Sequence, residues 1–262
     1  MFNSLFGVHV ELSSRCNKKC WMCGRRKVEK NNPRVKYGDM DFGLVHKIAN
    51  ELPSDIVIQF HKDGESLLYP RFGEAVKLFS RQITSLTTNG KLLVEKADEI
   101  IGVLDTLSVS IVEGDNEAED QYEILKKFLE MKGDKKPFTN AKLVGKIDQE
   151  RYEKLGILIV KRALHDPLGS FGYEKRIPAI PEIGICWALL KHIVISHEGK
   201  VSICVRFDPD GIGIIGDANT ESLDEIWNCG KRKSWILSHK MGRRNEIPLC
   251  QKCQFWGVPT NY

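Results

Sequence analysis

Apolar runs of strand length alternate with amphipathic, helix-like segments through the first two-thirds of the chain. The predicted strands are His9–Leu12, Ile56–Phe60, Ser85–Thr88, Thr106–Ile111, Ala141–Ile147 and Ile157–Lys161. The predicted helices are Asp41–Glu51, Arg71–Ser80, Leu92–Ile101, Glu117–Met131 and Gln149–Lys154. Such alternation predicts parallel strands joined by right-handed crossovers, with helices on the outer face. Six units are fewer than the eight of a closed barrel, so we expect an α/β fold with an open, partial (β/α)6 TIM-like barrel.

The pattern changes after residue 165. Pro and Gly residues at 166–169 and 177–184 indicate an irregular connection. Beyond it, His192–Ser196 and Val201–Val205 flank a four-residue turn and predict a β-hairpin.

One further short helix is predicted over Glu221–Trp227, opened by Thr220. We therefore expect a barrel domain over residues 1–168 and a small module containing the hairpin over residues 169–262. Such a module is too small to be held together by core burial alone.

Composition is that of an ordinary globular protein, with 42% hydrophobic residues, 28% charged residues and a formal net charge of +4 over 262 residues. The basic runs Arg25–Lys27 and Lys231–Lys233 are not interleaved with aromatic residues, so they indicate solvated faces rather than a nucleic-acid site. No apolar stretch approaches the roughly 18 residues of a membrane span. The start of the chain lacks the features of a signal peptide, and we expect a cytoplasmic protein.

Cys16, Cys20 and Cys23 follow the first predicted strand, at the end of a strand where α/β folds place active sites. Three thiolates in eight residues can hold three corners of a four-iron cluster and leave one iron open for a ligand. A zinc site would favour paired Cys-x-x-Cys motifs, and this segment has only one. The Arg, Lys and Asn residues between the cysteines argue against a buried structural role.

A second group of cysteines lies in the tail, at Cys186, Cys204, Cys250 and Cys253. Four thiolates can ligate a metal centre fully and stabilise the small module. Zinc and a second iron–sulfur cluster both fit this set by spacing alone. Cys229 is left over and lies near the end of the predicted helix.

In these segments the chain resembles the radical S-adenosylmethionine (SAM) enzymes. The resemblance rests on the Cys16-x-x-x-Cys20-x-x-Cys23 motif and on Lys62–Leu68, which is similar to the family's Gly-Gly-Glu region. Thr87–Gly90 and Thr106–Ser110 follow in the family's order and spacing, so the resemblance covers about residues 5–165. It implies a SAM cofactor on an open-cornered [4Fe-4S] cluster, a 5′-deoxyadenosyl radical, and an external electron donor such as flavodoxin or ferredoxin.

The resemblance also implies cofactor contacts. Glu65 would meet the methionyl ammonium group, and Gly64 would allow close backbone approach. Asn89 and Ser110 would meet ribose hydroxyls or the carboxylate. Met22 stands near the adenine, at a position where the family usually has an aromatic residue. Asp63 replaces the first glycine of the Gly-Gly-Glu region, which is a second departure.

The tail is similar to the auxiliary-cluster modules called twitch and SPASM. Its cysteines, its hairpin and the segment Gly216–Trp227 follow that pattern, which favours a second [4Fe-4S] cluster over zinc. By size and layout the chain is similar to radical SAM dehydrogenases that pair such a barrel with one auxiliary cluster. The resemblance therefore implies hydrogen abstraction from a small molecule, of the sugar or cyclitol class, with oxidation through the auxiliary cluster.

Other functions stay open at this point. An epimerase would quench the substrate radical with a thiol, for which Cys229 is the first candidate, although an incidental free cysteine is the favoured interpretation. Peptide-modifying relatives often carry an added recognition domain, and the first predicted strand begins already at His9. An electron carrier or metal-stabilised binding module would leave Gly64, Glu65 and Asn89 without a purpose. Neither His61 nor His165 is chosen as a catalytic base, and the oligomeric state is not predicted.

Overall fold

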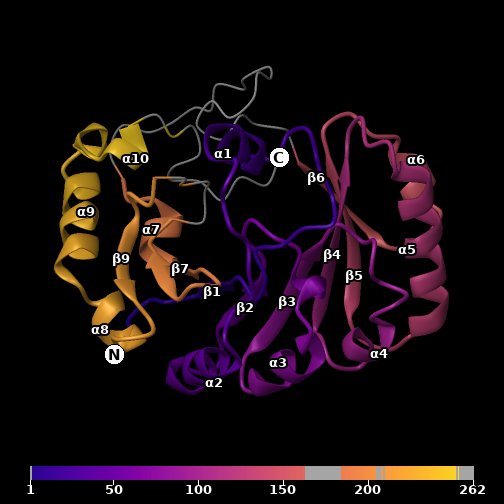
Figure 1. The fold of residues 1–262 in the computed structure, drawn as a ribbon, viewed down its shortest axis with the longest axis horizontal. Coiled ribbons are helices and arrows are strands. Elements are labelled where there is room, and N and C mark those ends of the chain that lie inside the picture. The colour runs from indigo at the N-terminus through magenta and orange to yellow at the C-terminus, as the bar shows by residue number, and fades with distance from the viewer. Residues whose placement is uncertain (1, 163–183, 205–207, 209, 252, 254–262) are drawn as a thin grey trace.

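The computed structural model describes residues 2–162, 184–204, 208, 210–251 and 253, and its strands form one nine-stranded sheet in the order β6-β5-β4-β3-β2-β1-β7-β8-β9 (Figure 1). The first six strands are parallel to their neighbours, β7 is parallel to β1, and β8 and β9 are antiparallel. The strands are β1 (Gly7–Val10), β2 (Val57–Phe60), β3 (Ile83–Thr88), β4 (Thr106–Val112), β5 (Phe138–Val144), β6 (Leu158–Arg162), β7 (His192–Ile195), β8 (Lys200–Ser202) and β9 (Ile214–Asp217).

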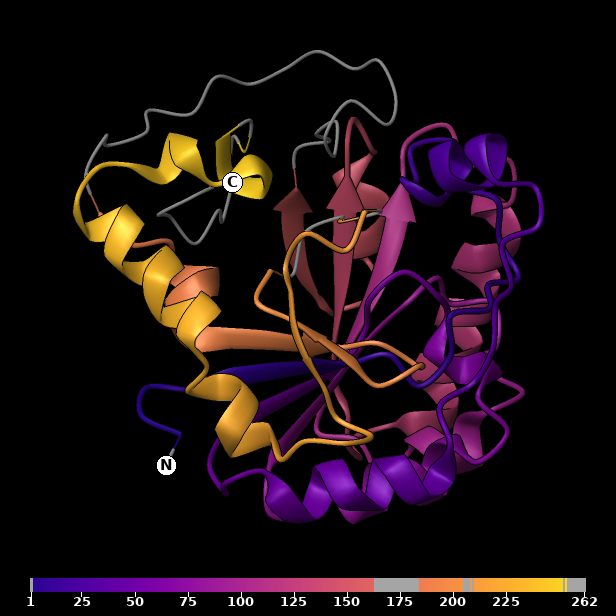
Figure 2. The same cartoon turned by 60° about the vertical axis from the view of Figure 1, so that its left-hand side comes forward.

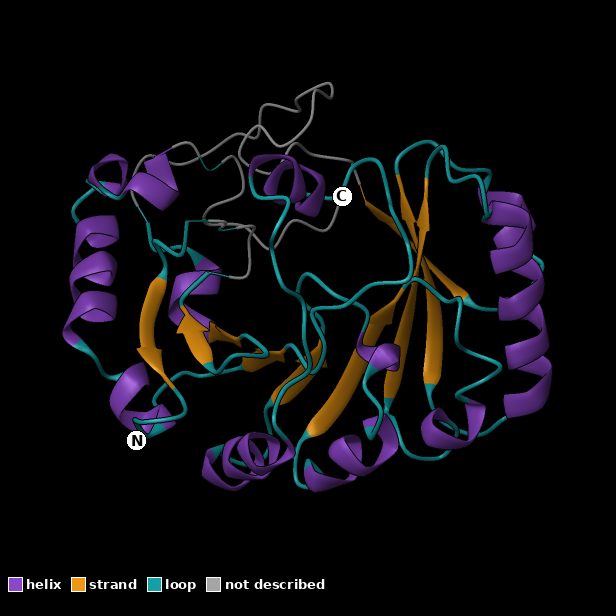
Figure 3. Cartoon of the chain, viewed as in Figure 1, coloured by secondary structure: helices purple, strands orange, loops and turns teal. Residues whose placement is uncertain are grey.

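The helices surround this sheet (Figure 3). They are α1 (Arg25–Asn31), α2 (Phe42–Glu51), α3 (Phe72–Leu78), α4 (Ala97–Ile100), α5 (Ala118–Lys132), α6 (Gln149–Glu153), α7 (Trp187–Lys191), α8 (Leu223–Trp227), α9 (Gly230–Lys240) and α10 (Pro248–Gln251), with 3-10 turns η1 (Ser66–Leu68) and η3 (Arg244–Glu246). Helices α2 to α6 cover the outer face of the first six strands, whereas α1 lies at the end toward which β4 and β5 point (Figure 2).

Side chains alternate between the two faces of the strands and give the sheet an apolar outside and a polar inside. Leu107, Val109, Ala141 and Leu143 are buried against the helices, as β4 and β5 show most clearly. The residues between them are only partly buried and face inward; they include His9, Gln59, Ser85, Thr87, Ser108, Ser110, Asn140 and Lys142. A polar inner face fits a barrel that holds a polar ligand rather than an apolar filling.

The predicted partial barrel is confirmed, since the six parallel strands and the helices that connect them are present. No pairing joins β6 to β9 among the described residues. The predicted hairpin is confirmed too, because Val194 pairs with Ser202. This hairpin is not a sheet of its own: β7 pairs with β1 from Gly7↔His192 to Val10↔Ile195. β9 adds a strand that the sequence did not predict.

Several predicted boundaries are corrected. The tail helix begins at Leu223 after the N-cap Ser222, rather than at Glu221 after Thr220, because Ser222 and Glu225 form a capping box. The helix predicted over Leu92–Ile101 is α-helical only over α4. The strand predicted over Ala141–Ile147 begins earlier and ends before Gly145, whose φ is +94°. The predicted domain boundary at 168/169, His165 and Val205 lie outside the described residues.

Candidate functional site

The loop that follows β1 carries the first three cysteines. Cys16, Cys20 and Cys23 are free and partly buried. Burial is the largest cause that raises the pKa of the Cys20 thiol to about 11; the nearby thiols of Cys23 and Cys16 act in the same direction, and the charge of Lys18 opposes them. Cys16 and Cys23 therefore both lie within electrostatic reach of Cys20. Such thiols lose their protons when a metal binds, which is the chemistry that an iron–sulfur cluster needs from them.

Basic side chains support this loop. Lys18 is buried and forms an ion pair with Asp115 in the loop after β4. Arg25 is also buried; it donates to the backbone oxygen of Asp63 at 3.3 Å, and its charge acts on Cys16 and Cys23. These cations offset the negative charge that three thiolates would bring into a partly buried loop.

The backbone of Gly64 packs so closely on the backbone of the cysteine loop that a side chain would not fit between them. A Cβ added at Gly64 would stand 2.0 Å from the backbone oxygen of Ser13 and 2.6 Å from the Cα of Ser14. The backbone N–H of Glu65 donates to the oxygen of Arg15 at 2.7 Å. The segment after β2 is therefore packed directly on the cysteine loop, and the nearest partner of Gly64 is that loop's own backbone.

The Glu65 carboxylate is 2% exposed and already accepts three hydrogen bonds. Its Oε1 accepts from Thr88 Oγ1 at 2.9 Å and from Leu67 N at 3.1 Å, and its Oε2 accepts from Asn89 N at 2.8 Å. Burial raises the pKa of this carboxyl group, while the bonds from Asn89, Leu67 and Thr88 oppose the shift. Glu65 thus ties the loop after β2 to the end of β3.

The Asn89 side chain reaches the cysteine loop. Its Nδ2 lies 2.8 Å from Asn17 Oδ1 and 3.9 Å from Cys16 Sγ. Ser110 lies inside the barrel on β4, opposite Lys142 on β5, and Met22 is partly buried within the cysteine loop. The structure therefore places Asn89 beside the first cysteine and Ser110 on the polar inner face.

A cavity of about 590 Å³ lies between residues 17–21 of the cysteine loop and the end of β4, where Val112 and residues 114–117 line it. Cys20 lines it, but Met22, Gly64, Glu65, Asn89 and Ser110 do not. We therefore do not assign this cavity to the cofactor contacts that the sequence predicts.

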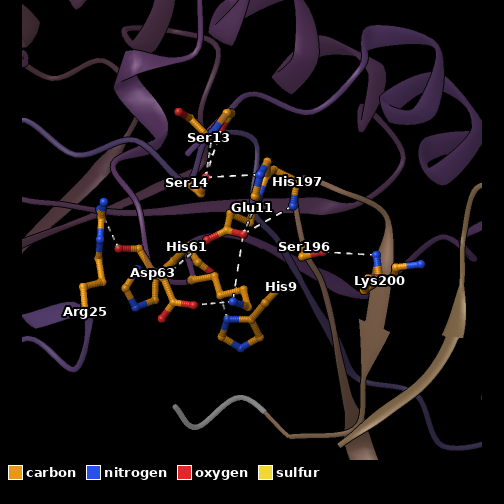
Figure 4. A network of polar contacts seen from close by, with 12 residues as sticks. His9, Glu11, Ser13, Ser14, Arg25, His61, Asp63, Ser196, His197 and Lys200 are labelled. Atoms are coloured by element: carbon orange, nitrogen blue, oxygen red, sulfur yellow. Dashed lines mark hydrogen bonds and ion pairs between the residues drawn. The ribbon is translucent and has the colours of Figure 1, made fainter. Parts of the chain in front are cut away.

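Glu11, directly after β1, is the centre of a network that the sequence analysis did not identify (Figure 4). Its Oε1 accepts from Asp63 N at 3.1 Å, and its Oε2 accepts from His197 N at 3.3 Å. Burial raises the pKa of Glu11, but the His197 hydrogen bond, the charge of Lys62 and the Asp63 bond outweigh it and lower the pKa to about 2. Strict alternation after His9 could have placed Glu11 on the inner face, since both residues have the same parity.

The inner face also holds basic groups. Burial and neighbouring positive charge lower the pKa of His9 to about 3 and that of His61 to about 4, so both imidazoles are neutral at pH 7. Burial and the charge of Arg162 lower the pKa of Lys142 to about 8, and its Nζ donates to Thr87 Oγ1 at 3.2 Å. No carboxylate among the described residues pairs with Lys142. In the sequence, only the alternation along β5 could have indicated that Lys142 faces the inside of the barrel.

The four tail cysteines come together as well. Cys186 is the N-cap residue of α7, Cys250 lies in α10, and Cys204 lies two residues beyond β8 rather than on it. Burial raises the pKa of Cys250, and the thiols of Cys204, Cys186 and Cys253 raise it further. Cys250 and the three thiols that act on it form a donor set that fits a fully ligated cluster.

Cys229 belongs to neither cysteine set, because the contact of its thiol is with the start of α9. It is the N-cap residue of α9, and its Sγ accepts from Arg232 N at 3.5 Å. No three His, Cys, Asp or Glu side chains of the described residues are placed to hold a single metal ion. A four-iron cluster is a different case, because each thiolate binds a different iron.

The two cysteine sets lie toward opposite ends of the β1/β7 pair. Cys16 follows the carboxyl end of β1, whereas Cys186 and α7 precede the amino end of β7. Because β8 is antiparallel to β7, the chain also leaves β8 toward that amino end before it reaches Cys204. On the inner face of this pair, the rings of His9 on β1 and His192 on β7 lie with their centroids 6.0 Å apart.

Comparisons with known proteins agree with this architecture. Residues 10–155 match the model of the Radical SAM superfamily, which is more than half of the chain, and residues 186–254 match SPASM, an iron–sulfur cluster-binding domain. The S-adenosyl-L-methionine-dependent 2-deoxy-scyllo-inosamine dehydrogenase of Niallia circulans is 25% identical over 97% of this chain and 94% of its own length. A cofactor-modifying protein for tungsten-containing aldehyde ferredoxin oxidoreductase from Pyrococcus furiosus is 34% identical over 40% of this chain, and the match spans 29% of that protein.

Two solved structures share the fold. BtrN in complex with AdoMet and 2-DOIA has a TM-score of 0.66 at 21% identity, covering 100% of this chain and 98% of that one. Streptococcus suis SuiB bound to the precursor peptide SuiA has a TM-score of 0.66 at 15% identity, covering 90% of this chain and 67% of that one. In the described part of the chain, no helix combines the length and apolar character of a membrane span.

Proposed function

Because this chain belongs to the radical SAM superfamily, we propose that it is a dehydrogenase that oxidises a small polar molecule of the sugar or cyclitol class. The family brings SAM and a [4Fe-4S] cluster as cofactors, and the SPASM match brings an auxiliary cluster. The observation that carries the proposal is the second set of four thiols, which gathers around Cys250 and is joined to the barrel through β7. An electron acceptor fixed to the barrel is what a dehydrogenase needs and an epimerase does not.

When bound, these groups supply a carbon-centred radical that removes a hydrogen atom from the substrate and an acceptor for the electron that the substrate then loses. Cys16, Cys20 and Cys23 would hold the SAM-binding cluster and leave one iron open. Cys186 would hold the auxiliary cluster together with Cys204, Cys250 and Cys253. The inner face between the two sets would receive the substrate.

The chain's own side chains would orient the cofactor. Asn89, next to Cys16, and Ser110 on the inner face would meet ribose hydroxyls or the carboxylate, and Met22 would pack near the adenine. Glu65 has its three hydrogen bonds inside the protein, so we propose that it acts chiefly by fixing Asn89 N, with Gly64 bringing the two loops together. The remaining side of the Glu65 carboxylate would meet the ammonium group.

The polar inner face supports a small, hydroxylated substrate. His9, Gln59, Thr87, Ser108 and Asn140 offer donors and acceptors there, and the Oδ1 of Asn140 is buried without a hydrogen-bond partner among the described residues. A ligand hydroxyl would satisfy such an acceptor. One relative of the chain is a 2-deoxy-scyllo-inosamine dehydrogenase, which adds support for this substrate class.

Two alternatives have weaker support. An epimerase needs a thiol near the substrate, and Cys229 instead caps α9. SuiB, whose structure holds a precursor peptide, shares the fold at 15% identity, which gives no argument about what this chain modifies.

We further propose that residues 1–168 and 169–262 act as the two functional units, and that flavodoxin or ferredoxin supplies the electron.

The proposal is tested by counting iron and products after anaerobic reconstitution. We expect about eight irons per chain, and about four in a Cys186→Ala/Cys204→Ala variant, because a [4Fe-4S] centre is held by cysteine thiolates. Both proteins should form 5′-deoxyadenosine with dithionite, but only the wild type should release an oxidised product from a sugar and cyclitol panel. A wild-type protein that holds four irons would remove the electron acceptor and with it the dehydrogenase proposal.

A further inference from the structure

Positive charge is concentrated in the segment that carries the first three cysteines. Nine of the chain's 39 Lys and Arg residues, and one of its 35 Asp and Glu residues, lie within residues 15–37. This segment therefore has a formal charge of +8, whereas the rest of the chain has a charge of −4. We call residues 15–37 the basic lobe.

The fold makes the basic lobe one compact structure. Ser14 N donates to Gly38 O at 2.9 Å, and Gly38 N donates to Ser14 Oγ at 3.0 Å, so the two ends of the lobe are joined. A bridge between Ser13 and Asp39 extends this junction. Helix α1, inside the lobe, lies at the end toward which the central strands point (Figures 1 and 2). The charges and the cysteines are thus held on the same projection.

The cations of the lobe have two different surroundings. Lys18 and Arg25 are buried and act on the cysteine thiols. Lys30, Arg34 and Lys36 are exposed, and none of them makes an ion pair with a described residue. Lys18 and Arg25 therefore have partners inside the protein. The ion pairs of the described residues do not account for the three exposed cations.

We propose that the exposed face of the basic lobe is the docking surface for an acidic one-electron carrier protein. The inference rests on the proposed function, because the cluster held by the lobe needs one electron from outside. A carrier docked on Lys30, Arg34 and Lys36 lies on the lobe that contains the electron's destination. The carrier loses one electron and the cluster gains it, with no proton transferred.

Charge complementarity selects an acidic partner at this place. Opposite charges steer two proteins into encounter and raise association rates by about 10- to 1000-fold, an effect that salt screens. The remainder of the chain, at −4, would repel the same carrier from other faces. The lobe is therefore the face at which an acidic carrier is attracted and can deliver its electron.

The test measures reduction of the reconstituted enzyme by photoreduced flavodoxin in stopped flow. We expect a Lys30→Gln/Arg34→Gln/Lys36→Gln variant to lose at least about 10-fold in the second-order rate at low salt, and most of its salt dependence. The matched control is Lys126→Gln/Lys127→Gln/Lys135→Gln, which changes the net charge equally at exposed positions on α5 and after it. It should stay within about twofold of the wild type, because surface charges away from the interface act weakly.

Dithionite separates this inference from the proposed function. All three proteins should keep the same iron content and the same rate of dithionite-driven 5′-deoxyadenosine formation. Absence of that product in the wild type would overturn the proposed function, while the flavodoxin rates would still report on docking. Equal flavodoxin rates in wild type and lobe variant would overturn the docking surface. An equal loss in the α5 control would also overturn it. So would binding of an oligonucleotide to the lobe, if reduction by flavodoxin then proved independent of salt.

Discussion

The Glu11 carboxylate and His197 join the end of β1 to the turn after β7. Glu11 Oε2 accepts from the backbone N of His197 at 3.3 Å and lies 3.2 Å from its Nδ1. The other ring nitrogen of His197 lies 3.3 Å from Ser14 Oγ, which also bonds Gly38 at the junction of the basic lobe. A single histidine of the tail therefore touches both the strand end and the lobe that holds the first three cysteines.

The Glu11–His197 contact should be measurable as a coupling free energy. We expect Glu11→Gln and His197→Phe each to lower the free energy of unfolding by about 1–3 kcal/mol, because each leaves a buried polar partner unsatisfied. The double variant should be less destabilised than the sum, by at least about 1 kcal/mol. Urea unfolding of the apoprotein at pH 7 gives all four values. Strict additivity would show that the two residues act independently.

Replacing Glu65 should lower the free energy of unfolding, because its proposed main role is to hold two loops together and not to contact the cofactor. Glu65→Gln replaces one carboxylate oxygen with a donor that must face Asn89 N or the Thr88 and Leu67 donors, so we expect a loss of about 2–3 kcal/mol. Thr88→Val is the control, since it removes one of these bonds without approaching the cofactor, and should lose about 1 kcal/mol. SAM binding is read from the electron paramagnetic resonance spectrum of the reduced cluster. Weakened SAM binding with unchanged stability in Glu65→Gln would favour direct contact with the ammonium group over the positioning role.

Gly64 should tolerate no side chain. Gly64→Ala would bring a Cβ to 2.0 Å from the Ser13 backbone oxygen, so the cysteine loop would have to shift. We expect a loss of at least about 3 kcal/mol and a fall in iron bound by the N-terminal cysteines. Gly230→Ala has no heavy atom within 4 Å of the added Cβ and should change stability by less than about 0.5 kcal/mol. Normal iron content in Gly64→Ala would contradict the close packing of Gly64 on the cysteine loop.

Lys142 should make stability depend on pH. Its pKa is lowered from 10.5 to about 8, so between these values the folded protein binds fewer protons than the unfolded one. The charged lysine therefore costs on the order of 3 kcal/mol below about pH 8, and this cost disappears as the pH rises to about 10.5. Lys142→Met should be more stable than wild type at pH 7 and equal to it near pH 10.5.

The control for this prediction is Lys161→Met, which removes one exposed lysine from β6. Thermal unfolding of the apoprotein across pH 7–10.5 gives the comparison. A Lys142→Met advantage that stays constant over this range would show that the lysine is destabilising through its packing and not through its charge.

The elements with clear periodicity were predictable from the sequence. The six barrel strands carry β-branched and apolar residues at strand spacing, and α5 carries Leu125 and Phe128 on one face. The cysteine sets were also predictable, because their spacing is local. These features can be recognised from residues that are close together in the sequence.

The missed features depend on distant partners or have no apolar pattern. Helix α1 has Val28 as its one apolar residue, so periodicity gave no signal. The β1–β7 pairing joins residues more than 180 positions apart and depends on burial of Ile193 and Ile195 in the shared core. Glu11 and Lys142 acquire their roles only from groups that the fold brings to them, such as His197 and Thr87.

The unbroken run of strands across β1 and β7 also constrains motion. A tail attached only by a linker could swing, but four residue pairs of parallel strand hold this one in register with the barrel. Four residues of strand span about 13 Å, and that rigid spacer lies between the two thiol sets. Any rearrangement during turnover must therefore take place in the loops that carry the cysteines, because the strands between the two sets are fixed in register.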